Sequence, residues 1–183
     1  METTLKFKGE ITISLHEQRN PFLRFYNKSL EVLFHSGLIS RQTLKKYYKL
    51  GDLIKTETKQ NIICAPGLNV LARRLASDNT YTGNINYMAL GSGTGAFDGT
   101  ETQLYTEVYR NAAASYTAQN NIAYISAFYD QTEVTGNFTE FGNFIDGTGS
   151  ANSGKLWSHI SIAWAKTSIQ TLTVDAKYTL ISA

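Results

Sequence analysis

The stretch MALGSGTGAFDGTETQLYTEVYR, residues 88–110, carries four closely spaced glycines that could cradle a phosphate. A phosphate loop needs backbone N–H groups at a helix N-terminus, a lysine for the charge and a hydroxyl for a metal ion. No lysine lies between Arg74 and Lys155, and no long helical pattern follows the dinucleotide-like set Gly91, Gly93 and Ala96. We therefore expect these glycines to shape the exit of a strand, where positive φ and close backbone approach are needed, and not to bind a nucleotide.

Other residue types that carry chemistry are few and widely spaced. His16, His35 and His159 have no metal-site spacing, and we expect His159 to face solvent or an interface. Cys64 is the single cysteine, which excludes a disulfide, and its apolar surroundings predict burial. The glycine-rich tip at residues 145–154 has one carboxylate, too few for a calcium loop. With no paired acids and no triad, the sequence predicts a protein that is not an enzyme and has no catalytic residues, metal ion or cofactor.

Aromatic and basic residues offer binding surfaces instead. Trp157 and Trp164, together with Tyr124 and Tyr129, could stack on sugars, which would make the chain a receptor- or carbohydrate-binding module. Arg73 and Arg74, with Lys45, Lys46 and Lys49, could contact DNA phosphates; the alternative is a solvated helix face. Residues 1–77 carry 13 basic and 6 acidic side chains, whereas residues 78–183 carry 4 and 9. This asymmetry fits a basic half that packs on the acidic half of a neighbouring copy, or one that meets nucleic acid.

The composition favours a sheet protein that holds these residues in place. The 183 residues are 42% hydrophobic and 17% charged, and 11 tyrosines with 9 phenylalanines favour strands. No segment approaches the roughly 18 apolar residues of a membrane helix, and the first residues lack the apolar core of a signal peptide. We expect a soluble protein that has no membrane partner.

Hydrophobic periodicity divides the chain into strands and helices. Alternation predicts strands over 4–15 and 52–63, while three- and four-residue spacing predicts helices near 21–36, 40–50 and 66–77. Further strands are expected over 85–91, 106–117, 121–134, 155–166 and 168–182. The predicted fold is an all-β antiparallel sandwich with a short packed helix and an N-terminal helical insertion, a β-rich α+β protein. Residues 1–50 would form a strand and helical hairpin that serve as an assembly arm, and residues 51–183 the sandwich domain.

The predicted helical hairpin has more apolar surface than so small a unit can bury by itself. Its large apolar side chains are therefore the predicted subunit interface. They are Phe22, Phe25, Tyr26, Leu30, Leu33, Phe34, Tyr47 and Tyr48.

Three ordered groups of residues carry a family resemblance. Thr102, Leu104, Glu107 and Arg110 follow the glycine corner; Glu140 and Gly142, which read as a turn, come next; Lys166, Ser168, Leu172, Thr173 and Val174 lie in the last strand. In this order, over about residues 50–182, they resemble small virion-structural proteins of tailed bacteriophages. The hairpin lies outside the pattern.

The resemblance implies a structural subunit of a virion, assembled in the host cytoplasm. Copies of the chain would form a ring or trimer in the neck, tail or fibre-attachment region, beside other virion proteins and in weak contact with packaged DNA. The alternative within the same class is a capsid decoration protein. Glu107 and Arg110 would then make a structural polar contact and not a catalytic one.

Overall fold

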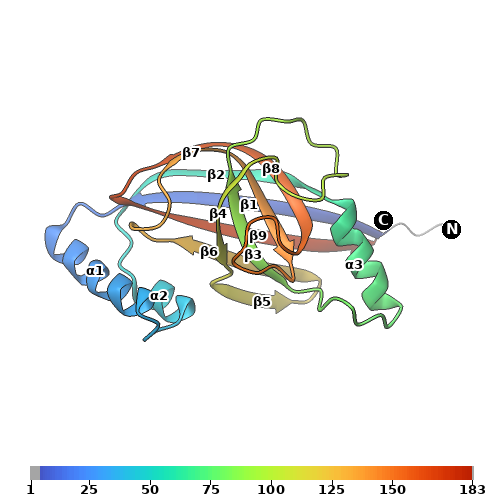
Figure 1. Ribbon diagram of the computed structural model, residues 1–183, viewed down its shortest axis with the longest axis horizontal. Helices are drawn as coiled ribbons and strands as arrows, with labels where there is room; N and C mark the ends of the chain where they lie inside the picture. The colour runs from blue at the N-terminus through green and yellow to red at the C-terminus, as the bar shows by residue number, and fades with distance from the viewer. Residues whose placement is uncertain (1–4, 183) are drawn as a thin grey trace.

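The computed structural model describes residues 5–182, which form nine strands and three helices (Figure 1). The strands are β1 (Leu5–Glu17), β2 (Asp52–Ile63), β3 (Ile85–Gly91), β4 (Glu107–Ala112), β5 (Ser115–Gln119), β6 (Ile122–Tyr129), β7 (Gly136–Ile145), β8 (Lys155–Lys166) and β9 (Gln170–Ser182). The helices are α1 (Pro21–His35), α2 (Arg41–Tyr47) and α3 (Ala65–Leu75). Over this described part of the chain, the helices are too short or too polar to cross a bilayer.

The strands form one antiparallel sheet in the order β4-β3-β7-β8-β2-β1-β9-β6-β5, which curls into a half-barrel. The two halves of the sheet join where β2 meets β8, through only two residue pairs, Ile62 with His159 and Ile63 with Ser158. The β-rich α+β prediction is confirmed, but the predicted sandwich of two separate sheets is not what these strands build. Beyond the junction β2 diverges from β8, and the Lys55 ammonium donates to the Ala163 carbonyl at 3.0 Å in place of a ladder bond.

The core fills the inside of the curl. Alternate residues of β1, Ile11, Ile13 and Leu15, face it together with Val174 of β9, and Phe141 of β7 meets them from the other half of the sheet. Each such side chain contributes roughly 1.5–3 kcal/mol by leaving water. The period-two pattern seen in the sequence is therefore the inward face of a long strand, as expected.

Two predicted elements were wrong. The expected strand over 106–117 is two strands at opposite edges of the sheet, because the chain crosses from one half to the other at Ala113 and Ala114. The expected turn at Glu140 and Gly142 is the middle of β7, which pairs with both β3 and β8. Both faces of β7 are buried from Glu140 onward, so this strand shows no apolar–polar alternation.

The helices occupy the two ends of the half-barrel (Figure 1). The α1–α2 hairpin extends from the end where β1 finishes and β2 begins, and α3 lies at the other end, where β1 begins and β9 finishes. Asn20 caps α1 by accepting from the N–H groups of Phe22 and Leu23, and Ser40 caps α2. These two side chains fix where the helices begin.

Candidate functional site

Helix α1 buries two polar side chains and exposes several large apolar ones. Its fully buried residues are Asn27 and Glu31, whereas Phe22 is 75% and Phe25 72% exposed. Three- and four-residue spacing puts these phenylalanines on one side with the exposed residue Val32. We call Phe22, Phe25, Val32 and Leu33 the outer face of α1. A helix of a self-sufficient domain normally turns its apolar stripe toward the core.

Asn27 closes the base of the hairpin. Its side-chain amide donates to the carbonyl oxygen of Lys49 at 2.8 Å, and its Oδ1 accepts from the N–H of the same residue at 2.9 Å. Gln18 donates to the same carbonyl at 3.1 Å. One buried side chain thus satisfies both backbone groups at the point where the chain leaves α2 and returns to the sheet.

Glu31 and Tyr48 join α1 to the chain just after α2. The Tyr48 hydroxyl donates to Glu31 Oε1 at 2.6 Å, and the Tyr48 ring packs edge-on against Phe128 with ring centroids 4.9 Å apart. Burial raises the pKa of Glu31, and it raises the pKa of Tyr48 strongly. With Leu44 and Ala114, this contact forms a small core between the hairpin and the sheet.

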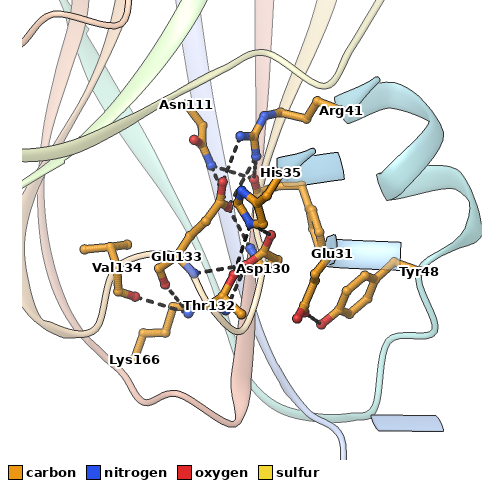
Figure 2. A network of polar contacts seen from close by, with 11 residues as sticks. Glu31, His35, Arg41, Tyr48, Asn111, Asp130, Thr132, Glu133, Val134 and Lys166 are labelled. Carbon is orange, nitrogen blue, oxygen red and sulfur yellow. Dashed lines mark hydrogen bonds and ion pairs between the residues drawn. The ribbon is translucent and has the colours of Figure 1, made fainter. Parts of the chain in front are cut away.

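Arg41 at the start of α2 makes the strongest ionic contact with the sheet (Figure 2). Its Nη2 lies 2.8 Å from Glu133 Oε1, and its Nη1 donates to the Phe128 carbonyl at 3.0 Å. Glu133 Oε2 accepts from the Asn111 side chain and from the N–H of Asp130, each at 2.9 Å. A buried ion pair with further hydrogen bonds on both partners fixes geometry, and losing one partner is costly.

The network continues to His35 and Lys166 (Figure 2). His35 Nε2 lies 3.4 Å from Asp130 Oδ2, and the buried Lys166 ammonium donates to the carbonyl oxygens of Glu133 at 2.7 Å and Val134 at 3.1 Å. Burial lowers the pKa of Lys166 to about 8. In the part of the chain that the structure describes, no three histidine, cysteine or acidic side chains could hold a metal ion. Arg41 and His35 of the hairpin contact Glu133, Asp130 and Phe128, and we call this set of contacts the anchor of the hairpin.

The predicted interface residues separate into two sets. Phe22, Phe25, Leu33 and Tyr47 are exposed, but Tyr48 is buried in the small core between the hairpin and the sheet, and Leu30 and Phe34 pack against the same core. Tyr26 is half-buried. Tyr48 was thus wrong as an interface residue, because its ring and hydroxyl are both used inside the chain.

The two tryptophans do not form a sugar platform. Trp157 is 7% and Trp164 4% exposed, and both belong to the main core. A stacked sugar needs an open ring face, so the carbohydrate-binding alternative loses both tryptophans and the buried Tyr129, whereas Tyr124 is 39% exposed. The aromatic signal in the sequence came from core packing.

The glycine run does surround an anion, but the anion is the chain's own Glu140. The Glu140 carboxylate accepts from the N–H groups of Gly93 at 2.9 Å, Tyr105 at 3.0 Å and Thr106 at 2.8 Å. A Cβ on Gly93 would lie 2.5 Å from Glu140 Oε1, so glycine is required for this approach. Sequence reasoning missed Glu140, although a buried carboxylate is the natural counterpart of a lysine-free glycine loop.

His159 is the other partner of Glu140. Its Nε2 lies 2.9 Å from Glu140 Oε2, and the ring is fully buried beneath Phe97, with centroids 3.6 Å apart. Burial lowers the pKa of His159, against the opposing effect of Glu140. The prediction that His159 faces solvent or an interface was wrong. Cys64 is buried as predicted, and burial raises the pKa of its thiol to about 12.

The charge asymmetry is partly neutralised within the chain. Arg41 from the basic half pairs with Glu133 from the acidic half, and Lys45 lies 3.9 Å from Asp175. Glu107 and Arg110 pair with each other across a bulge in β4, a structural contact as expected.

No family model, curated protein or solved structure matches the chain.

Proposed function

We propose that the chain is a structural subunit of a tailed-phage particle and that it assembles with copies of itself through the outer face of α1. The observation that carries the proposal is that α1, although it is held on the sheet, leaves Phe22 and Phe25 almost fully exposed. The anchor already fixes α1 on the sheet, so little conformational entropy is lost when a partner binds. Interfaces are enriched in aromatic side chains that a rigid scaffold presents.

The location in a virion has separate support. Over about residues 50–182 the order of motifs resembles small virion-structural proteins, and the hairpin adds an assembly arm to that pattern. A helix that docks on a different surface of the next copy makes a head-to-tail contact, which closes into a ring when the rotation between copies closes. The proposal therefore includes a ring or trimer in the neck, tail or fibre-attachment region.

Native mass measurement tests the assembly. By light scattering after size exclusion, the wild-type chain should have the mass of a trimer or a larger ring, at least three times the 20.3 kDa of one chain. Each buried phenylalanine contributes roughly 1.5–3 kcal/mol, so Phe22→Ser with Phe25→Ser should weaken association by about a hundredfold or more. Leu75→Ser is the matched control, because Leu75 is 77% exposed but lies on α3 at the other end of the molecule (Figure 1).

Two results would contradict the proposal. A wild-type chain that stays monomeric at millimolar concentration has no self-association to explain. Equal loss of assembly in the Leu75→Ser control would place the contact elsewhere. The number of copies in a purified particle then distinguishes the two locations, since a neck or tail ring has few copies and a capsid decoration protein has many.

A further inference from the structure

Helix α3 covers the other end of the half-barrel incompletely. Its buried residues are Gly67 and Val70, while Leu68 and Leu75 are exposed. Gly67 fixes the start of the helix, because a Cβ there would lie 2.8 Å from the Cα of Trp157. Farther along α3, Val70, Leu71 and Arg74 lie over this end of the core.

A cavity of about 190 Å³ lies between these residues of α3 and the sheet. Six strands contribute to its wall, which is almost entirely apolar and includes Ile85, Ile145, Trp157 and Tyr178. An adjoining hollow of about 300 Å³ shares Gly83, Ile85 and Ala123 with the cavity. The second hollow runs along β5 and β6 to the exposed Tyr116 and Tyr124, so the cavity has a path to solvent.

The path opens because the curled sheet closes at one end only. At the hairpin end the Asn111 side chain of β4 donates to the Phe128 carbonyl of β6 at 2.9 Å. Toward α3 the two edges diverge, and the second hollow lies between the residues that lead into β3 and the β5–β6 pair. The sheet topology itself therefore produces an opening beside α3.

Two polar groups stand out in this apolar wall. Arg74 of α3 is the one charged side chain among the described residues that line the cavity, and its guanidinium donates to the Asn79 side chain. A guanidinium has five N–H donors, so others remain for a ligand. Trp157 is almost fully buried, and within residues 5–182 its indole N–H has no hydrogen-bond partner. Such a donor normally has an acceptor.

We propose that this cavity binds an aliphatic carboxylate of medium chain length, with the chain among the apolar side chains and the carboxylate at Arg74. An apolar cavity of about 150 Å³ takes a ligand the size of benzene, and drug-sized pockets begin near 300 Å³. A volume of about 190 Å³ therefore suits a chain close to that of octanoate. The site lies at the end of the molecule away from α1, and it is independent of the proposed assembly (Figure 1).

Titration of the full chain with octanoate, followed by calorimetry and by methyl NMR, tests the proposal. Saturable binding with a dissociation constant of about 1 mM or tighter is expected, with shifts confined to methyl groups such as those of Val70, Ile85 and Ile145. Ala123→Phe should fill the wall that the two hollows share and abolish binding of both octanoate and octanol.

Variants of two neighbouring arginines distinguish the contribution of the ligand's carboxylate from that of its aliphatic chain. Arg74→Gln should weaken octanoate about three- to tenfold and leave octanol unchanged. Arg73→Gln should change neither, because Arg73 does not line the cavity and pairs with Asp78 at 2.8 Å. If Ala123→Phe does not fold, the methyl shifts in the wild-type chain decide the location of binding.

Three results would overturn the proposal. They are the absence of saturable octanoate binding, methyl shifts centred outside the cavity, and equal weakening by Arg73→Gln and Arg74→Gln. The last would indicate a general charge effect of α3 on an anion and not a contact at the cavity.

Discussion

The buried ammonium of Lys166 should make the free energy of unfolding depend on pH. Its ammonium donates to two carbonyl oxygens, and burial lowers its pKa from 10.5 to about 8. Between these two values the unfolded chain binds more protons than the folded chain, so this group makes the folded state gain stability as pH rises from 8 to 10. Lys166→Met removes the titration. The stability of the wild type relative to Lys166→Met should therefore rise by about 2 kcal/mol over that range.

Urea unfolding at pH 7, 8, 9 and 10 measures this difference. Titration of Cys64 and the tyrosines, which opposes the gain at high pH, is common to both proteins and cancels. Lys166→Arg is the control, because a guanidinium stays charged and should show no gain between pH 8 and 10. A flat difference between wild type and Lys166→Met would mean that the ammonium is well enough solvated to keep its ordinary pKa.

The glycine run shows what residue types alone could and could not establish. The need for close backbone approach was foreseen for the glycines of this run, and the structure shows it at Gly91 and Gly93. The identity of the anion was not foreseen, because Glu140 lies 47 residues from Gly93 along the chain. Its contacts with the loop depend on the pairing of β7 with β3, which no local pattern specifies.

Secondary-structure elements with one buried face were predictable from the sequence. The alternation in β1 and the three- and four-residue spacing in α1 and α2 located these elements, since local periodicity decides them. Strand β7 was not predictable in this way, because Phe138, Glu140 and Phe141 are all buried and its two faces look alike. In α1 the apolar residues were recognised, but which of them face the sheet depended on Glu133 and Phe128 far along the chain.

The hairpin should behave as one unit held by a few contacts. Asn27→Ala removes both hydrogen bonds to the backbone of Lys49, so we expect the hairpin to open locally at a cost about 1–3 kcal/mol lower than in the wild type. Hydrogen exchange read by mass spectrometry should show faster exchange over residues 21–49 and unchanged protection in β1 and β9.

Ser29→Ala is the matched control on the same helix. Ser29 is exposed, and its hydroxyl donates only to the Phe25 carbonyl one turn earlier. This change should leave exchange of the hairpin nearly unchanged. Faster exchange in β1 and β9 upon Asn27→Ala would show instead that the hairpin and the sheet unfold together.

The whole molecule separates two surfaces along its long axis (Figure 1). The anchored hairpin presents the outer face of α1 at one end, and α3 covers an apolar cavity at the other. The half-barrel between them carries a continuous core from Ile11 and Val174 to Phe141, so each end rests on the same rigid body. Changes at one end should therefore leave the other end intact.

The proposed assembly through α1 has a consequence for the stability of the whole chain. A partner that binds only the folded state stabilises it by mass action, so the melting temperature of an oligomer rises with protein concentration. We expect the wild-type melting temperature to rise by several degrees between about 1 and 100 µM, since a hundredfold excess over the dissociation constant adds about 2.7 kcal/mol. Scanning fluorimetry across that range measures the shift.

Phe22→Ser with Phe25→Ser should remove this concentration dependence. The melting temperature of the variant at 1 µM should stay close to that of the wild type, because neither ring packs in the core. A concentration dependence that survives in this variant would assign the self-association to another surface.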